Sequence, residues 1–262
     1  IGELTEGFTG KSTKKDLETM FQMINLYFTA PKKDPVAFNS YMQKMRGFIE
    51  NRDLSPDRVF FDSVKTVVNS NHFRSQSLTI EKLNMINHDD VMSTYKERFS
   101  NPEDFTFIFV GNIEVKEFTA YVNRYLSSLP IGGKKESWVD VGKVFPDDVV
   151  DMKINKGMEE KSFVYLTFSG GDKWSEQNAH SLNTFTNSFK IKLREVLREE
   201  MGGTYGIWMP SNIDQYPNEK FMFRVIFGCD PSRVEDLSEA LFAQIDSVKS
   251  FGLEEKYLNK SK

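Results

Sequence analysis

The amino-acid sequence predicts an α+β protein of two similar domains, each with a mainly antiparallel sheet backed by helices. The spacing of apolar residues changes from a helical period to strict alternation near residue 105. Residues 131–146 mix glycine, proline and charge without periodicity, as linkers do. A strand-like stretch leads through glycine into an amphipathic helix twice, in FTFIFVGNIEVKEFTAYVNRYL and FMFRVIFGCDPSRVEDLSEALF. We therefore expect one domain over residues 1–135 and another over residues 136–262.

Helices dominate the first half of the chain. Asp34 before Pro35 and Ser55 before Pro56 are start signals, because a side-chain acceptor caps a helix and proline suits its first position. Pro31 ends the helix that comes before them. Apolar residues at helical spacing predict helices over residues 17–28, 35–49, 56–68 and 88–99.

The last part of the first half changes its pattern. FTFIFVGN, residues 105–112, has the alternation of a strand. Residues 115–129 then have the period of an amphipathic helix, which ends before Pro130.

The second half mixes both patterns. Alternating or aromatic-rich stretches predict strands, and longer stretches with apolar residues on one side predict helices. The expected strands cover residues 150–154, 163–168, 205–209 and 221–227, and the expected helices cover residues 175–201 and 232–250.

Composition excludes several classes of protein. Hydrophobic residues make up 39% of the chain and charged residues 27%, which is a globular rather than a disordered composition. A net charge of -4 with scattered Lys and Arg argues against a nucleic-acid-binding surface. The apolar runs are too short for a transmembrane segment. A single cysteine excludes an internal disulfide framework.

Side chains suited to metal or nucleophilic chemistry are few. His72, His88 and His180 form neither H-x-x-E-H nor H-E-x-x-H, so we expect no zinc site in this chain. Cys229 has no histidine nearby in sequence and is expected to be a buried thiol. SGGDKWS, residues 169–175, lacks the rest of a phosphate-binding motif and is expected to be a connecting loop.

A helix that ends at two glycines is the most specific feature. Helix-favouring residues continue to Met201, and Gly202-Gly203 ends the helix because glycine adopts the left-handed conformation common at helix C-termini. Arg198 lies in the last turn and Tyr205 opens the next element. A purely structural explanation is adequate so far, since a cation near a helix C-terminus is stabilised by about 0.3–1 kcal/mol.

Together with its surroundings, this segment resembles a known family. LREEMGGTYG, residues 197–206, is similar to the L-R-x-x-x-G-x-x-Y segment in the C-terminal half of the pitrilysin and insulysin family of zinc metallopeptidases. DLETMFQMINLYFTAPKKDPVAF, residues 16–38, resembles the helix pair of that family with its F-x-x-P-x-x-D-x-x-A-F break. FTFIFVGNI followed by a helix and Leu129-Pro130 resembles the strand, glycine and helix that close each family domain.

The resemblance implies a role for two residues. Family members have two homologous halves, each of two α+β domains, that enclose a peptide in a chamber. The N-terminal half carries H-x-x-E-H and a distal glutamate, which hold zinc and provide the base. The C-terminal half supplies an arginine and a tyrosine, matched here by Arg198 and Tyr205. Tyr205 would then donate a hydrogen bond toward the scissile carbonyl as its oxygen becomes negative, and Arg198 would position the substrate.

The resemblance also implies partners and a cofactor. We expect the chain to be a C-terminal half trimmed at both ends, with a peptide substrate and a zinc-carrying N-terminal half on the same or a partner polypeptide. Zinc is expected in the full-length protein and none in this chain. The branch resembled is that of bacterial periplasmic or cell-envelope proteases, with a cytoplasmic location as the alternative. A second functional class stays open, a catalytically silent structural or chaperone-like subunit, and an H-x-x-E-H motif upstream would favour the enzyme.

Overall fold

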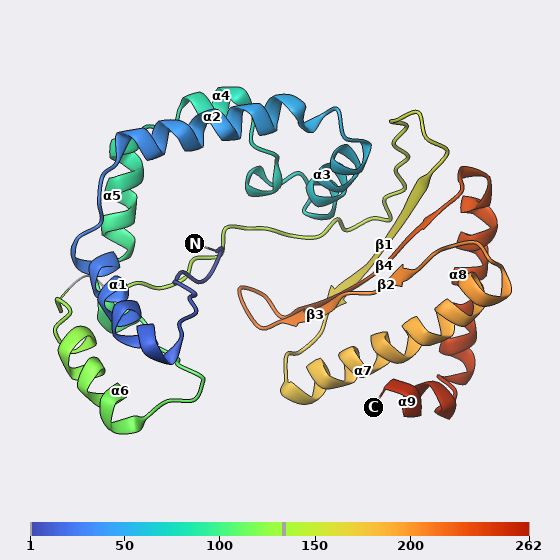
Figure 1. The fold of residues 1–262 in the computed structure, drawn as a ribbon. Helices are drawn as coiled ribbons and strands as arrows, with labels where there is room; N and C mark the ends of the chain where they lie inside the picture. The colour runs from blue at the N-terminus through green and yellow to red at the C-terminus, as the bar shows by residue number, and fades with distance from the viewer. Residues whose placement is uncertain (1, 133–134, 262) are drawn as a thin grey trace. The chain divides into compact units, whose positions relative to one another are not determined.

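The computed structural model describes residues 2–132 and 135–261, which fall into two compact units (Figure 1). The first unit comprises Ile1–Leu54 and Leu78–Val139, and the second comprises Ser55–Ser77 and Asp140–Lys262. Each unit has its own buried centre and is described by itself.

The first unit is helical in its described residues. Thr13, Asp34 and Asn87 each accept a backbone N–H of the following turn through the side chain, and Pro35 occupies the first position of its helix. The elements are η1 (Lys14–Asp16), α1 (Leu17–Thr29), α2 (Pro35–Arg52), α4 (Ile80–Asn84), α5 (His88–Arg98), η3 (Pro102–Asp104), α6 (Val115–Tyr121) and the π-helical η4 (Val122–Leu126).

Aromatic rings form the buried centre of this unit. Phe28 lies 5.1 Å from Phe105 and 6.0 Å from Phe99 between ring centroids, in edge-to-face arrangements. Phe21, which is fully buried on the same helix, lies 5.4 Å from Phe118 of α6. The phenylalanines of α1 therefore pack this helix against α6 and against residues 99–105.

FTFIFVGN, residues 105–112, is not paired with another strand in the structure. Phe107 and Phe109 face α1, with the Phe109 ring stacked 5.1 Å from Phe21. Ile108 and Val110 point the other way and are 80% and 94% exposed. A strand needs a neighbour to receive its backbone hydrogen bonds, and the described part of this unit has none. The strand predicted here is therefore wrong in this structure, and the alternation reflects packing of one face only.

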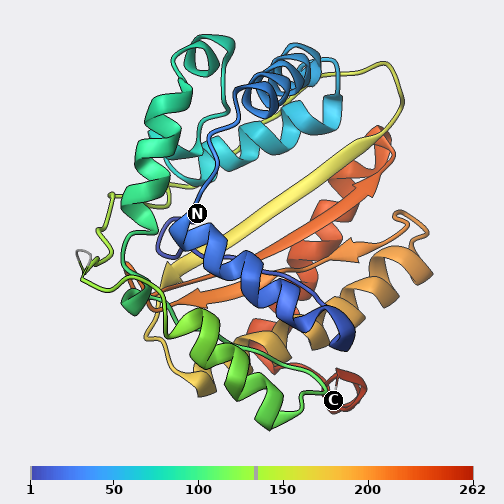
Figure 2. The ribbon, with the colours of Figure 1, turned by 60° about the vertical axis from the view of Figure 1, so that its left-hand side comes forward.

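The mainly antiparallel sheet of the α+β fold is confirmed, and it lies in the second unit. β4 is its central strand, because β1 pairs along one edge from Ser162↔Cys229 to Gly171↔Lys220, while β2 and β3 pair with the other edge. Figure 2 shows β1 and β4 running side by side over their full length. The strands are β1 (Ser162–Gly171), β2 (Ile207–Trp208), β3 (Ser211–Asp214) and β4 (Lys220–Cys229).

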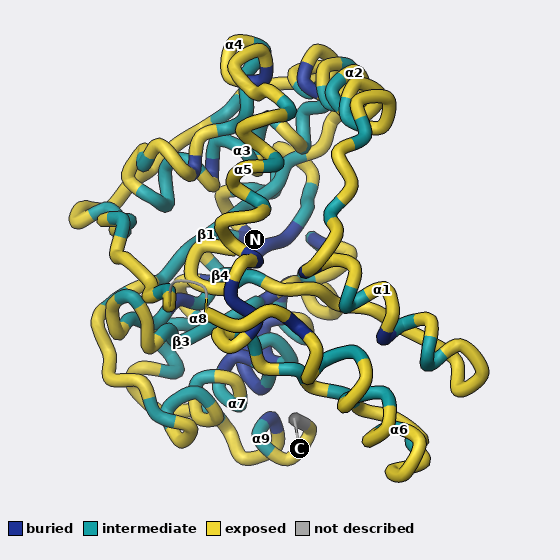
Figure 3. The backbone as a smooth tube through the Cα atoms, turned by 90° about the vertical axis from the view of Figure 1, so that its left-hand side faces the viewer, coloured by how far each residue is buried: buried dark blue, intermediate teal, exposed yellow. Residues whose placement is uncertain are grey.

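Five helical elements follow β1 in the chain: α7 (Glu176–Leu193), the π-helical η5 (Arg194–Glu200), η6 (Pro231–Arg233), α8 (Val234–Phe251) and α9 (Glu255–Ser261). Of these, α7, η5 and α8 build the main core of this unit against one face of the sheet. Figure 3 shows buried backbone gathered around α7 and β4. The fully or almost fully buried side chains of this core are Phe189, Leu193, Leu197, Val225, Phe227, Leu237 and Leu241.

α3 (Pro56–Val68) covers the opposite face of the sheet. Phe61 lies 5.7 Å from Phe163 of β1, whereas the next residue of the strand, Val164, packs against the core formed with α7 and α8. Lys161 and Asp57 add an ion pair of 3.2 Å. Residues 55–77, which contain α3 and η2 (Phe73–Ser75), were expected in the first domain; their contacts with β1 place them in the second unit.

Residues 135–161 contain no helix or strand. The side chain of Asn218 donates to Asp140 at 3.0 Å, and Lys220 lies 4.7 Å above the Phe145 ring, so residues 140–145 are held to the second unit. The strand predicted over residues 150–154 does not form, for the same reason as residues 105–112: no other strand lies beside it in the described chain.

Candidate functional site

Arg198 lies in a π-helical continuation of α7. Met201 N–H donates to the carbonyl of Val196 at 3.0 Å, which is the wider i to i−5 closure of a π-helix. Leu197 is fully buried and anchors this turn to the core. The Arg198 side chain is 49% exposed, and its Nε lies 3.8 Å from a carboxylate oxygen of Glu199, beyond hydrogen-bond range. Within the part of the chain that the structure describes, the Arg198 guanidinium forms no hydrogen bond.

The two glycines that end this helix do different things. Gly202 has φ of +59° and donates to the carbonyl of Arg198 at 3.1 Å, so the left-handed stop expected from the sequence is confirmed. Gly203 donates to the carbonyl of Leu197 at 3.0 Å and lies directly against Leu237 of α8. A Cβ on Gly203 would meet the Leu237 side chain at 2.4 Å. The chain therefore turns next to α8, at a distance at which any Cβ would require the Leu237 side chain to shift.

Tyr205 is displayed at the apex of the segment that follows. The hydroxyl of Thr204 donates to the carbonyl of Gly206 at 3.1 Å and accepts its N–H at 3.3 Å. Thr204 is buried, whereas Tyr205 is 99% exposed. We call residues 201–206 the tyrosine turn. It fixes one neighbour of the tyrosine inside the protein and leaves the phenol outside.

Arg198 and Tyr205 thus lie on either side of one helix stop, joined by the backbone bond from Gly202 to Arg198. No hydrogen bond or ion pair connects their side chains in the described residues. Tyr205 comes just before β2, which pairs with β4, so the turn is tied to the sheet on its far side.

The other end of the π-helical segment is tied to α9. Glu195 accepts a hydrogen bond from Lys260 Nζ at 2.8 Å and another from the Tyr257 hydroxyl at 2.9 Å. These two donors, Lys260 first, lower the pKa of Glu195 below its ordinary value. Tyr257 is buried, so its hydroxyl holds the helix from inside the unit.

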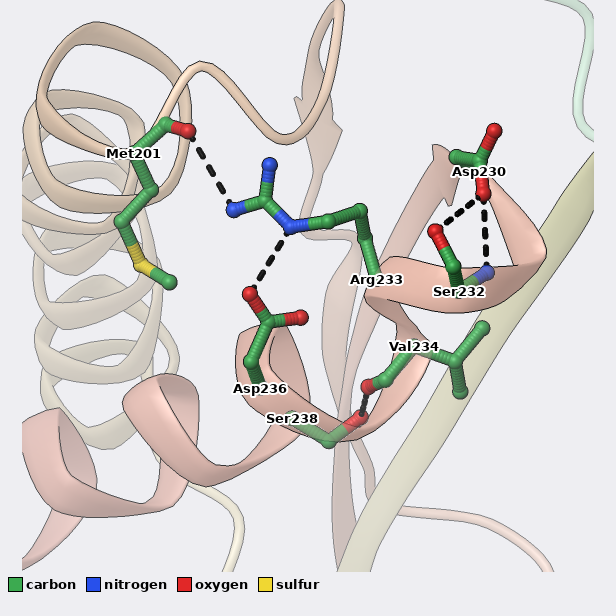
Figure 4. Close-up of polar contacts among 7 residues, drawn as sticks. All are labelled: Met201, Asp230, Ser232, Arg233, Val234, Asp236 and Ser238. Carbon is green, nitrogen blue, oxygen red and sulfur yellow. Dashed lines mark hydrogen bonds and ion pairs between the residues drawn. The ribbon is translucent and has the colours of Figure 1, made fainter.

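Arg233, the last residue of η6 and the N-cap of α8, reaches the tyrosine turn, and the sequence gives no signal for this contact. Arg233 donates through Nη2 to the carbonyl of Met201 at 3.3 Å and through Nε to Asp236 at 2.8 Å (Figure 4). The sequence predicts only a helix that begins at residue 232, and in the structure Asp230 accepts the N–H of Ser232 just before α8. The contact with Met201 joins residues 32 positions apart, so no local pattern could show it.

A model of the peptidase M16 inactive domain matches residues 85–262, which include the tyrosine turn and the whole of the sheet. The chain belongs to the peptidase M16 family. The resemblance to the half of a zinc metallopeptidase that lacks the zinc motif is thereby confirmed.

Known relatives of this M16 domain are zinc proteases by name. It is 25% identical to the probable zinc protease PqqL of Haemophilus influenzae over 99% of its own length and 28% of that protein. Its fold is similar to the periplasmic protease PqqL from Escherichia coli, with a TM-score of 0.81 and 19% identity, covering 94% of this chain and 27% of that one. A peptidase M16 inactive domain from Pseudomonas fluorescens gives a TM-score of 0.67 at 13% identity, over 95% of this chain and 60% of that one. The chain thus spans about a quarter of the length of the PqqL proteins.

The family implies zinc, and the residues of this M16 domain do not fit it. His72 is engaged on both ring nitrogens, by Val141 at 2.9 Å and by the N–H of Arg74 at 3.3 Å, and His88 stacks on Phe38. No three histidines, cysteines or acidic residues of the described chain lie together as metal ligands would.

Two other features have structural roles. Ser175, at the end of SGGDKWS, accepts the N–H of Asn178 at 3.0 Å and caps α7. Cys229 is half-buried, and burial, followed by the charges of Asp230 and Asp236, raises the pKa of its thiol, which disfavours a nucleophilic thiolate. Among the residues that the structure describes, no helix has the length and apolar character needed to span a bilayer.

Proposed function

We propose that this M16 domain is the non-zinc half of a zinc metalloendopeptidase. It would help to enclose a peptide substrate and would present Arg198 and Tyr205 to the bond that the zinc-carrying N-terminal half cleaves. The zinc would act in that other half as a Lewis acid and would activate water. The same proposal divides this half into a first α+β domain over residues 1–135 and a second over residues 136–262. Residues 55–77 are the exception, because they pack with the second unit.

The observation that carries the proposal is the display of Tyr205. The Tyr205 side chain is 99% exposed, whereas its neighbour Thr204 is buried and hydrogen-bonded. The aromatic ring therefore exposes a large apolar surface to water and contributes nothing to the packing of the domain. A peptide laid over the turn would cover that ring. Its O–H could then donate to a carbonyl oxygen as negative charge develops on it.

Arg198 would act on the same peptide from the helix end. Its guanidinium is half-exposed and its contact with Glu199 is too long for a hydrogen bond. A planar fork of donors can hold a backbone carbonyl in a set orientation, which an ammonium group does less well. We place the protein in the bacterial periplasm or cell envelope, in line with the periplasmic PqqL from Escherichia coli whose fold it shares.

Tyr205→Phe in the intact protein, with its zinc-carrying half, tests the proposal. Removal of one oxyanion donor should lower kcat by about 10²-fold or more with a smaller change in KM. Tyr41→Phe is the matched control, because it removes the hydroxyl of another exposed tyrosine, on α2. Equal kinetics of Tyr205→Phe and the wild type, with both folded, would return the domain to the alternative of a catalytically silent structural or chaperone-like subunit.

A further inference from the structure

Arg233 contacts the tyrosine turn at a carbonyl that the helix itself leaves unused. The last carbonyls of a helix have no N–H of a following turn to bond with. The carbonyl of Met201 is one of these, since no backbone N–H of the described chain donates to it. Arg233 Nη2 donates to it from the start of α8, and the positive charge also suits the negative end of the helix dipole.

Asp236 fixes the direction of this guanidinium. Its carboxylate accepts from Nε of Arg233 at 2.8 Å, one turn further along α8 (Figure 4). Asp236 of α8 therefore holds one edge of the Arg233 guanidinium, and the other edge is directed to the tyrosine turn. The side chain is 35% exposed, so water screens the pair only in part.

α8 meets the turn at a second point. Leu237, in the first turn of α8 and four residues after Arg233, is the fully buried side chain against which Gly203 packs. The N-cap of α8 thus binds the carbonyl of Met201, and its first turn contacts the backbone of Gly203; these two residues lie on either side of the left-handed Gly202. Two contact points on a rigid helix set the path of the chain from Arg198 to Tyr205.

We propose that Arg233 is a positioning residue, which acts through the Met201 carbonyl to hold the tyrosine turn, and with it Tyr205, in place relative to Arg198. This inference rests on the function proposed for Tyr205. Arg233 does not touch the substrate in this scheme. Its loss allows Tyr205 to move while the phenol itself stays intact.

A cap that only stabilises the fold would give a different set of effects. It would change the unfolding temperature but not turnover by the molecules that remain folded. A positioning residue changes kcat more than KM, because a displaced donor is lost chiefly in the transition state. It also loses its effect once the group that it positions has been removed.

The test compares Arg233→Ala, Arg233→Lys and the control Arg194→Ala in the intact protein with its zinc-carrying half. Arg194 is an exposed arginine of the same π-helical segment, and its side chain forms no hydrogen bond or ion pair within the described chain. In Arg233→Ala, kcat should fall on the order of ten-fold with KM changed less than about two-fold. Amide exchange of Gly202 and Gly203, followed by mass spectrometry, should quicken by about ten-fold.

For Arg233→Lys, kcat and the amide exchange rate should lie between those of the wild type and Arg233→Ala. A single ammonium can reach Met201 or Asp236 but does not bridge them as the guanidinium fork does. In the Tyr205→Phe background, Arg233→Ala should lower kcat by no more than about two-fold further. Arg194→Ala should leave amide exchange of the turn as it is.

Two results would overturn the inference. One is unchanged amide exchange at Gly202 and Gly203 in Arg233→Ala. The other is a full ten-fold loss of kcat that persists in the Tyr205→Phe background, which would mean that Arg233 acts independently of the tyrosine. If Tyr205→Phe alone has no kinetic effect, the proposed function fails, and the exchange measurement then decides by itself whether Arg233 holds the turn.

Discussion

Gly203 lies so close to Leu237 that a Cβ on the glycine would be 2.4 Å from a methyl carbon of the leucine. The two residues bring the tyrosine turn and α8 into direct contact, and Leu237 is fully buried in the main core, so any shift of its side chain would disturb that core. The position of Tyr205 therefore depends on the contact between Gly203 and Leu237, which is this close because glycine has no Cβ.

Gly203→Ala should lower the free energy of unfolding by about 1–3 kcal/mol, since the extra methyl group must displace a packed core side chain. The measurement is urea unfolding followed by circular dichroism. Gly206→Ala is the matched control, because a Cβ there meets no atom within 4 Å. Its stability should be unchanged or raised by about 0.5 kcal/mol. Equal stabilities for the two variants would show that Leu237 yields to the methyl group.

Arg198→Lys should impair turnover in the intact protein while the charge is conserved. We expect kcat/KM to fall by about ten-fold or more, because an ammonium lacks the planar fork of donors that holds a carbonyl. Arg194→Lys, four residues earlier in the chain, serves as the control and should keep wild-type kinetics. A wild-type value of kcat/KM for Arg198→Lys would limit Arg198 to stabilising the helix end.

Glu195 should make stability depend on pH. Its pKa is lowered in the folded protein, so the unfolded chain binds the proton at a higher pH than the folded chain does. The stabilisation is therefore complete above the ordinary value of 4.5 and is lost as the pH falls through the lower folded pKa. Glu195→Gln should have a lower unfolding temperature than the wild type near neutral pH, and the difference should shrink below that value.

Glu200→Gln is the control for this measurement, because Glu200 is exposed and its side chain forms no hydrogen bond or ion pair within the described chain. Its unfolding temperature should follow that of the wild type at each pH. If the difference for Glu195→Gln stays the same between about pH 7 and pH 3, the bonds to Lys260 and Tyr257 do not depend on its charge.

Residues 105–110 should promote self-association of the isolated chain. Ile108 and Val110 are exposed on a segment without charges, and such unpaired apolar backbone attracts other chains. Ile108→Lys should reduce association in analytical ultracentrifugation with little loss of stability. Phe107→Lys should instead destabilise the unit, because this ring packs against Phe28. Unchanged association in Ile108→Lys would place the contact elsewhere.

Local chemistry was enough to locate many of the elements. Asp34 with Pro35 predicts the start of α2, and the structure shows the expected hydrogen bonds from that side chain. The two glycines after Met201 predict the helix stop, and Gly202 has the required positive φ. These features depend on neighbours in the sequence, so the sequence contains all the information that they need.

The family and the residues of interest also followed from the sequence. The segment from Arg198 to Tyr205 indicated a metallopeptidase half, and the M16 match over residues 85–262 confirms the family. The roles of Arg198 and Tyr205 stay predictions, which the kinetic variants above can test.

What only the tertiary structure decided is which parts of the chain meet. Residues 105–112 and β4 have similar alternation, yet only β4 has neighbours on both edges, and a strand is stable only when its backbone groups are paired. α3 was assigned by sequence order to the first domain and packs on β1 of the second unit instead. Arg233 bonds to a carbonyl 32 residues away, and Gly203 rests on Leu237. The sequence by itself determined the local starts and stops, because those bonds are short in sequence; the long-range contacts depend on a packing that no local pattern encodes.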